Sequence, residues 1–433
     1  MAHFLMILIL TSTLFLSSFS SQNTHHTIPI GSSITADQNS KPWLSPSGDF
    51  AFGFQQLPGN KTDLYVLSIW FAKLLDRTVA WFDRQLAPHG ATLTLDAING
   101  LVLLDHHGKP LYYYTKNLAG RPAYASMTDA GNFVVWGNDS NTPLWESFTN
   151  PADTLLPTQS IAINGSSLVS RKSRADFSYG RFYAAMNAQG NFALSTKSVF
   201  TSSDFDAEYY NSNPISGDRL VLDGSSLSIH SLGGINGKSN VIIPGPNLLP
   251  SEYYFRAVLD FDGVFALYYH PRKINNNSEW VYVGSLPDHN ICIDIGGDTG
   301  SGACGYNSVC SLENWRPVCS CPRGFTLVDP NNRYGGCKPE FSGNRCSQGG
   351  PEDYELVEIP DVDWPKNDYE QINPSTVGQC RDACMSDEFC GAAIFRSLSC
   401  WKKRLPLSNG KLDTGLGSVA FLKVRKGSVN QLD

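Results

Sequence analysis

The stretch DAGNFVVW, residues 129–136, places a glycine directly ahead of alternating apolar residues. The same arrangement recurs in QGNFALS (189–195), INGLVLL (98–104) and SGDFAFGF (47–54). Gly131, Gly190 and Gly48 can supply the unusual backbone angles of a tight turn, and the alternation that follows is the period of a strand with one buried face. The recurrence therefore predicts turn-rich antiparallel β-structure.

Composition supports this fold class. The 433 residues include 38 Gly and 25 Pro, aromatic residues reach 12% and charged residues only 17%. These values favour β-structure over helical bundles, and the length allows two to four domains. The net charge of −7 provides no global field that would attract nucleic acid or an anionic membrane, so neither is expected as a partner.

Short alternating runs separated by Gly, Pro, Asn and Asp continue from about residue 28 to 275. The clearest runs are LYVLSIWFA (64–72), TVAWFD (78–83), FVVWG (133–137), RFYAAM (181–186) and VFALYY (264–269). The polar, proline-containing segment FTNPADTLLPTQS (148–160) predicts a boundary between two β-domains. HPRKINNNSEW (270–280) is typical of an exit loop.

The first residues have the pattern of a secretory signal peptide. An apolar run from Phe4 to Leu16 is followed by small residues, and cleavage is expected near Ser20. The run is too short to span a bilayer comfortably. In a secreted chain the Asn-x-Ser/Thr sequons at Asn60, Asn138, Asn164 and Asn276 are expected to carry glycans.

Strand alternation also suggests a binding surface. Phe133 and Val135 share one face of their strand, while Asn132, Val134 and Trp136 share the other. An amide can bond sugar hydroxyls, and apolar groups can cover the C–H faces of a sugar. The alternative is that this row forms only the outer face of a structural repeat.

Several segments resemble the bulb-type (monocot mannose-binding) lectin domain, which in plants forms the extracellular part of G-type lectin S-receptor-like serine/threonine kinases. They are LSPSGDFAFGF, TVAWFD, NGLVLLD, DAGNFVVW and LWESFTNPADTLLP, and SYGRFYAAMNAQGNFAL and AVLDFDGVFALYYHP resemble a second such domain. The resemblance covers about residues 27–426. It implies three-sided prisms of four-stranded sheets. No kinase motif is present in the chain.

The mannose motif of that family, Gln-x-Asp-x-Asn-x-Val-x-Tyr, is incomplete here. The corresponding positions hold Thr128, Ala130, Asn132, Val134 and Trp136; Asn187, Gln189, Asn191, Ala193 and Ser195; and Asp96, Ile98, Gly100, Val102 and Leu104. A missing Asp removes a charge-assisted hydrogen bond of roughly 1.5–3 kcal/mol. We therefore expect weak mannose binding, with Asn132, Val134, Trp136 and Asn191 as the candidate carbohydrate residues.

All 11 cysteines lie between residues 292 and 400, and the first six have the C-x-C, Pro, Gly and aromatic pattern of an EGF-like module. Such a small unit depends on disulfides for stability. Spacing alone allows fifteen pairings. The resemblance implies Cys292–Cys310, Cys304–Cys319 and Cys321–Cys337. A zinc site is the competing interpretation, but C-x-C lacks finger spacing, so no metal is expected.

The last cysteines lie in a module that resembles the PAN/apple domain. TVGQCRDACMSDEFC (376–390) predicts a helix with Cys380 and Cys384 on one face. The expected pairs are Cys380–Cys400 and Cys384–Cys390. Glu388 stands where that pattern usually has a cysteine, which leaves Cys346 as the unpaired candidate. A free Cys346 would allow a homodimer through this region.

One enzyme signature occurs. Asp298-Thr299-Gly300-Ser301 is similar to the signature of aspartic proteases, and Asp413-Thr414-Gly415 repeats part of it. However, glycines flank Asp298, and it lies six residues before Cys304 rather than on an apolar strand. We expect a chance match, and we expect no catalytic residue or cofactor.

The predicted organisation is mainly β, with a signal peptide (1–20), two lectin domains (22–148 and 149–278), an EGF-like module (288–340) and a PAN module (346–426). The predicted function is ligand recognition by the extracellular region of a plant receptor-like kinase in cell-surface perception, with a glycan or protein as partner. The groove between the two lectin-like domains is a candidate ligand surface, although the sequence names no residue in it. The chain would be secreted or lie on the outer face of the plasma membrane. The alternatives are a soluble secreted lectin-like glycoprotein, acting as a decoy or wall protein, and an aspartic-type protease.

Overall fold

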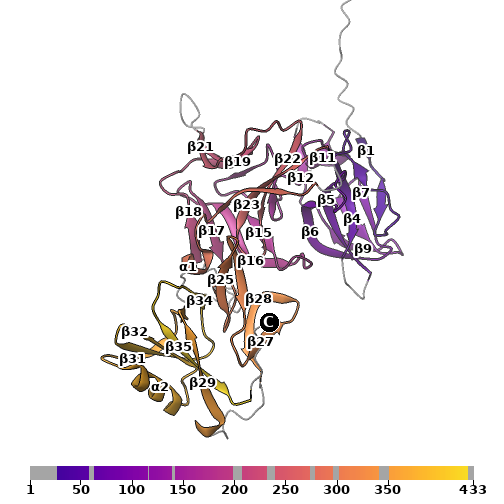
Figure 1. The fold of residues 1–433 in the computed structure, drawn as a ribbon. Coiled ribbons are helices and arrows are strands. Elements are labelled where there is room, and N and C mark those ends of the chain that lie inside the picture. Colours follow the sequence, from indigo (N-terminus) through magenta and orange to yellow (C-terminus); the bar gives the residue numbers. More distant parts are fainter. Residues whose placement is uncertain are drawn as a thin grey trace, which may run out of the picture.

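The computed structural model describes residues 27–57, 63–115, 117–138, 142–197, 207–231, 239–273, 278–295, 302–340 and 351–427. Strands dominate these residues, which confirms the predicted fold class (Figure 1). The signal-peptide segment, Asn60, Asn276, Asp298 and Cys346 lie outside the described residues.

Strands β1–β12 form three antiparallel four-stranded sheets, which we call the first prism. Its sheets are β1 (Thr27–Pro29), β10 (Pro122–Met127), β11 (Phe133–Gly137) and β12 (Pro143–Glu146); β2 (Ser33–Thr35), β7 (Thr92–Asp96), β8 (Gly100–Leu104) and β9 (Pro110–Tyr113); and β3 (Trp43–Leu44), β4 (Phe50–Gln56), β5 (Leu64–Phe71) and β6 (Val79–Pro88). Phe52, Leu103 and Phe133, one from each sheet, belong to a common buried core.

Strands β13–β24 repeat this arrangement as the second prism. Its sheets are β13 (Thr154–Leu155), β22 (Tyr253–Leu259), β23 (Phe265–Pro271) and β24 (Val281–Leu286); β14 (Ser160–Ala162), β19 (Arg219–Asp223), β20 (Ser226–His230) and β21 (Ser239–Ile243); and β15 (Leu168–Arg171), β16 (Tyr179–Met186), β17 (Phe192–Thr196) and β18 (Ala207–Asn211). Phe192, Leu220 and Phe265 pack in its core.

The glycine turns have the predicted geometry. Gly131, Gly190 and Gly48 have φ of 86°, 81° and 69°, in the left-handed region that favours glycine. In the first of these turns the Thr128 amide donates to the Asn132 carbonyl. A Cβ on Gly131 would lie 2.5 Å from Leu156 Cδ1, so close packing also requires glycine there.

The two prisms pack directly against each other. Tyr254 of β22 is only 2% exposed because its ring lies in the core of the first prism, 5.1 Å from the ring of Phe71. Its hydroxyl donates to Asp49 Oδ1 at 2.8 Å. Trp280 Nε1 also reaches across and donates to Thr78 Oγ1 at 2.9 Å. These contacts hold the prisms in one relative position.

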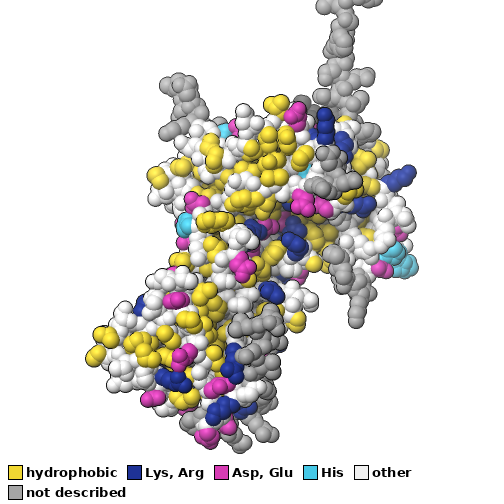
Figure 2. Space-filling view, viewed as in Figure 1, with side chains coloured by type: hydrophobic (Ala, Val, Ile, Leu, Met, Phe, Trp, Pro, Cys, Tyr) yellow, Lys and Arg dark blue, Asp and Glu magenta, His cyan; other side chains and the backbone are white. Residues whose placement is uncertain are grey.

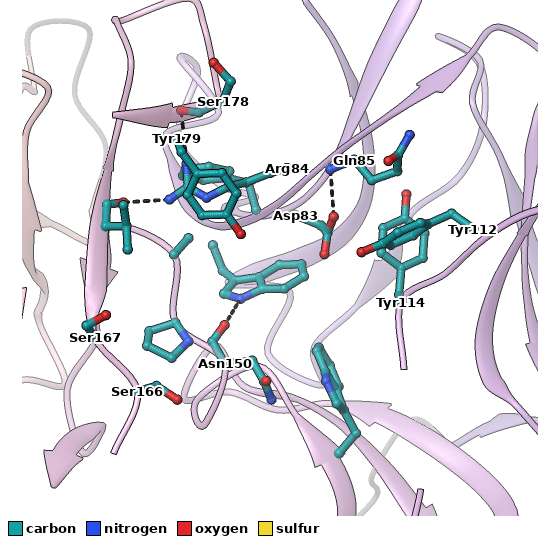
Figure 3. A pocket seen from close by; sticks show the side chains of 16 residues that line it. Asp83, Arg84, Gln85, Tyr112, Tyr114, Asn150, Ser166, Ser167, Ser178 and Tyr179 are labelled. Atoms are coloured by element: carbon teal, nitrogen blue, oxygen red, sulfur yellow. Dashed lines mark hydrogen bonds between the residues drawn. The ribbon is translucent and has the colours of Figure 1, made fainter. Parts of the chain in front are cut away.

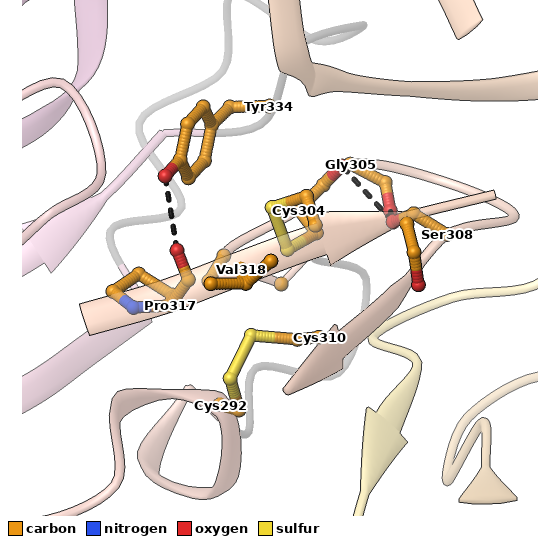
Figure 4. Close-up of a disulfide and its surroundings, with 12 residues drawn as sticks. Cys292, Cys304, Gly305, Ser308, Cys310, Pro317, Val318 and Tyr334 are labelled. Carbon is orange, nitrogen blue, oxygen red and sulfur yellow. Dashed lines mark hydrogen bonds between the residues drawn. A yellow bond between two sulfur atoms is a disulfide. The ribbon is translucent and has the colours of Figure 1, made fainter. Parts of the chain in front are cut away.

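The cysteine-rich region contains α1 (Ile291–Asp294), β25 (Val309–Glu313), β26 (Arg316–Ser320), β27 (Phe325–Asp329) and β28 (Asn332–Pro339). Its disulfides join Cys292 to Cys310, Cys304 to Cys319 and Cys321 to Cys337, the same pairs that the resemblance implies. Figure 4 shows Cys292 of α1 joined to Cys310 of β25.

The C-terminal region contains a five-stranded sheet and the predicted helix. Its elements are a 3-10 turn (Pro351–Asp353), β29 (Tyr354–Pro360), β30 (Val362–Asp363), β31 (Asp368–Ile372), α2 (Val377–Ser386), β32 (Ala392–Arg396), β33 (Ser399–Lys403), β34 (Lys411–Leu412) and β35 (Val419–Arg425). Thr376 caps α2 in a capping box with Gln379. Cys380–Cys400 joins α2 to β33, and Cys384–Cys390 joins α2 to the loop that follows.

These last two regions are more closely joined than their separate sequence patterns suggest. Strand β34 pairs with β25, so one sheet contains strands from both. Trp364 is fully buried, and its indole donates to the carbonyl of Ser308 at 3.0 Å.

The face of the molecule seen in Figure 2 mixes Lys and Arg with Asp and Glu, without a large area of one charge sign.

Candidate functional site

A groove of about 650 Å³ lies where the two prisms meet (Figure 3). We call it the interprism groove. Residues from both prisms line it, including Trp81, Asp83, Arg84, Gln85, Tyr112, Tyr114, Trp145, Asn150, Ser166, Ser167, Ser178 and Tyr179.

Strand β6 forms the centre of the groove because it is the edge strand of its sheet. The pairing of β6 with β5 shifts in register between Phe82 and Leu86, and the consecutive residues 81–85 of β6 all line the groove. Phe82 packs edge-to-face on Phe177 of the second prism, with 4.8 Å between ring centroids.

The base of the groove is aromatic. The rings of Trp81 and Trp145 meet edge-to-face at 5.9 Å, and Trp81 Nε1 donates to the Asn150 carbonyl at 2.6 Å. Tyr112 and Tyr114 form a second edge-to-face pair at 5.1 Å. Rings fixed in this way present preformed apolar faces to a ligand.

Arg84 joins the prisms. Its Nη1 donates to the carbonyls of Phe177 and Ser178 at 3.0 and 3.1 Å, and its Nη2 donates to that of Val169 at 2.7 Å. Its guanidinium also lies 4.2 Å from the ring centroid of Tyr179. Burial lowers the pKa of Arg84 from its usual value, although nearby Asp153 opposes this effect. Since several of its donors are used on carbonyls, Arg84 mainly positions the groove wall.

Polar groups stand beside these rings. Asp83 Oδ1 accepts a hydrogen bond from the backbone amide of Gln85 at 2.8 Å, and Gln85 itself is an exposed residue. The buried hydroxyl of Tyr114 has no hydrogen-bond partner within the described protein. Burial, with smaller effects from Asp83 and Tyr112, raises the pKa of Tyr114 well above its usual value, so the hydroxyl stays a donor. A hydroxyl buried without a hydrogen-bond partner costs free energy in the folded chain.

The row predicted on β11 is not an open surface. Asn132 accepts hydrogen bonds from Ser147 Oγ and the Phe148 amide, and its Nδ2 donates to Glu146 Oε2 at 2.7 Å. Val134 is only 3% exposed. Trp136 is half-buried, and its indole donates to Ser126 Oγ at 3.0 Å.

Asn191, the other predicted carbohydrate residue, lies in the second prism and is buried. Its Nδ2 donates to the Ile215 carbonyl at 3.0 Å. The four predicted residues therefore do not form one site, and none of them lines the interprism groove. In the structure Asn132 and Asn191 tie the start of a strand to a neighbouring loop.

A further turn of the same kind was not recognised from its sequence. Gly263 has φ of 89° and the Asp260 amide donates to the Val264 carbonyl, which makes Asp262 the equivalent of Ala130. This acidic position is covered, because Arg316 of β26 pairs with Asp262 at 2.9 Å and with Asp260 at 2.5 Å. The turn thus anchors the cysteine-rich region.

Comparisons with known proteins agree with this fold. The family model described as D-mannose binding lectin matches residues 78–176. The chain is 36% identical over 452 residues to the G-type lectin S-receptor-like serine/threonine-protein kinase LECRK3 of Oryza sativa subsp. indica, covering 99% of this chain and 54% of that protein. It is 36% identical over 440 residues to the corresponding kinase RLK1 of Arabidopsis thaliana, covering 95% and 51%.

Two solved lectins are also similar. The Japanese Marasmius oreades lectin has a TM-score of 0.21 and 14% identity, covering 32% of this chain and 92% of the lectin. The two-domain, fetuin-binding Scilla campanulata agglutinin has a TM-score of 0.20 and 16% identity, covering 59% and 92%.

The three-sheet repeat and the family match define a protein with a bulb-type lectin domain. More particularly, the chain is similar over nearly its whole length to the G-type lectin S-receptor-like serine/threonine-protein kinases, as the sequence resemblance predicts. It spans about half the length of these relatives and contains no kinase domain.

No helix in the described ranges is long and apolar enough to cross a membrane. The same residues contain no group of three His, Cys, Asp or Glu side chains that could hold a metal ion. Asp413 of the shorter protease-like signature accepts a hydrogen bond from the amide of Gly415 within its own loop.

Proposed function

We propose that this chain is the extracellular carbohydrate-recognition region of a plant receptor-like kinase, and that it binds glycan in the interprism groove. The observation that carries the proposal is the groove itself, in which fixed aromatic rings stand beside Asp83 and Gln85. The similarity to lectin-bearing kinases supports the same conclusion.

The residues fit the chemistry of a sugar. A sugar ring has an apolar C–H face that packs on an aromatic ring, and hydroxyls at its edge that need hydrogen-bond partners. Tyr112 and Trp145 are half-buried and can offer such a surface. Asp83 can accept from hydroxyls, while Gln85 and Asn150 can both donate and accept.

Binding at the β11 row is expected to be weak. The amide of Asn132 is already hydrogen bonded at both its oxygen and its nitrogen, so sugar binding there would have to break internal bonds. The amide nitrogen of Asn191 is used in a similar way. These contacts support our expectation that the incomplete mannose motifs contribute little.

The placement of the chain outside the cell is part of the same proposal. Two of the predicted glycosylation sites, Asn138 and Asn164, are exposed, as a glycan requires. Five disulfides in the described residues fit an oxidising compartment. Recognition of a glycan by this region would then be the first step of cell-surface perception.

Titration of the secreted chain against an array of plant and microbial glycans, followed by calorimetry, tests the proposal. Tyr112→Ala should weaken binding about tenfold, which corresponds to about 1.4 kcal/mol, a reasonable value for one aromatic platform. Tyr113→Ala is the matched control, because Tyr113 is 39% exposed and does not line the groove. Equal affinities of these two variants for every bound glycan would contradict the proposal.

A further inference from the structure

We propose that the ligand of the interprism groove is an extended oligosaccharide, and that the cysteine-rich region contributes to its binding. This inference rests on the proposed glycan recognition and names the ligand class more narrowly. It places one end of the oligosaccharide in a second hollow, which adjoins the groove.

The second hollow has a volume of about 610 Å³. We call it the outer hollow. Three parts of the chain line it: Leu57, Arg84 and Leu86 from the first prism, Lys172, Asp176 and Ser178 from the second, and Asp329, Asn331 and Asn332 from the β27–β28 hairpin. Arg84 and Ser178 also line the interprism groove, so the two spaces are neighbours that share a wall.

An aromatic platform lies beside the shared wall, on the side of the interprism groove. Tyr179 follows Ser178, lines the groove and is 68% exposed. Arg84 lies 4.2 Å from its ring centroid, and Arg84 is itself held by three carbonyl contacts of the second prism. A ring supported in this way loses little freedom when a ligand stacks on its exposed part.

The outer hollow has the mixed lining of a sugar subsite. Leu57 and Leu86 offer apolar surface. Lys172 is exposed and pairs with Asp176 only at 3.7 Å, so its ammonium can also reach a sugar hydroxyl. Asn331 is exposed at the tip of the hairpin, where its backbone amide donates to Asp329 Oδ1 at 3.0 Å and fixes the turn.

Size supports a ligand of several units. The volume of each space alone lies within the roughly 300–1,000 Å³ of pockets that hold drug-sized ligands. Each volume is therefore larger than one six-membered sugar ring requires. A single sugar could fill only part of the groove. An oligosaccharide that passes Tyr179 could occupy both spaces. Each further sugar unit would then add contacts without a second loss of translational freedom.

The test is a length series. The secreted chain is titrated by calorimetry with manno-, cello- and chito-oligosaccharides of one to six units. For the series that binds, affinity should rise at least tenfold from the disaccharide to the hexasaccharide. Asn331→Ala and Lys172→Ala should each weaken hexasaccharide binding about three- to tenfold, as expected for one lost hydrogen bond, and leave disaccharide binding unchanged.

Asn247→Ala and Lys109→Ala are matched controls, since both residues are exposed and neither lines the two spaces. Equal affinities for the disaccharide and the hexasaccharide would overturn the inference while leaving groove binding intact. A rise with length that neither Asn331→Ala nor Lys172→Ala reduces would also overturn it. Failure of all three series to bind would instead count against the proposed function, and the inference would fall with it.

Discussion

Tyr254 provides a direct test of how the two prisms are held together. Tyr254→Phe removes only the hydroxyl that donates to Asp49 Oδ1. A hydrogen bond to a charged group contributes roughly 1.5–3 kcal/mol. Asp49 keeps its ion pairs with Lys73 and Arg272, so the expected loss lies at the lower end, about 1–2 kcal/mol. Tyr254→Ala also removes a buried ring and should cost about 3–5 kcal/mol.

Urea denaturation followed by tryptophan fluorescence measures these losses of unfolding free energy. Because a chain with several domains need not unfold in one step, the comparison uses the transition in which the interface between the prisms opens. Tyr282→Phe is the control, since Tyr282 is 49% exposed and its hydroxyl bonds only to nearby Ser285. It should change stability by less than about 0.5 kcal/mol. If Tyr254→Phe proves no more destabilising than Tyr282→Phe, the interface hydrogen bond does not contribute and the reasoning fails.

This effect should also depend on pH. Burial raises the pKa of Asp49, but hydrogen bonds from Lys73 and Tyr254 and the charge of Arg272 together bring it below its usual value. A carboxylate with a lowered pKa stabilises the fold above the unfolded value of about 3.9, and this contribution disappears as pH falls through the folded value. The stability gap between wild type and Tyr254→Phe should therefore narrow below about pH 4.

Three other predictions concern separate features. Gly263→Ala should lower the unfolding free energy by about 2 kcal/mol or more, because φ is 89° and a Cβ would lie 2.5 Å from Phe182 Cε1. Gly224→Ala is the control, since Gly224 has φ of 60° and open space around it, and it should lower the unfolding free energy by less in the same denaturation. Burial raises the pKa of Asp262 to about 7 against the opposing charge of Arg316. The contribution of Asp262 to the unfolding free energy is therefore full below about pH 3.9 and falls as pH rises towards 7, so the stability of wild type relative to Asp262→Asn should be greatest at low pH. A stability difference that does not depend on pH would contradict this. If Cys346 is unpaired, non-reducing electrophoresis should show a dimer that Cys346→Ser abolishes, whereas a wild-type monomer with no thiol detectable after unfolding would show that the predicted pairing is wrong.

The architecture was accessible from sequence because its signals are local. A glycine that must adopt positive φ and the alternating residues after it lie within one stretch, so DAGNFVVW alone predicts the turn at Gly131 and strand β11. The helix α2 was predictable for the same reason, since Thr376 and the pair Cys380 and Cys384 lie within three turns. Such features depend on backbone geometry and on period, which neighbouring residues determine.

The β11 row shows where local reasoning stops. Alternation correctly places Phe133 and Val135 in the core, and it places Asn132 on the opposite face. It does not reveal that Glu146 and Ser147, fourteen and fifteen residues later, use the amide of Asn132. A polar side chain opposite a core is accessible only if no other strand reaches it, and that depends on pairing rather than period.

The sequence allowed a ligand surface to be expected between the two lectin-like domains, but its residues could not be named, for a related reason. Its residues come from both sides of the boundary predicted near residue 148, and neither side alone has a groove to recognise. Arg84 illustrates this, because in its own run it is an ordinary surface cation that follows TVAWFD. In the structure its donors are used on Val169, Phe177 and Ser178 of the next prism, and Tyr179 lies against its guanidinium. A candidate binding surface built between two repeats can therefore diverge in sequence while the repeats keep their turns.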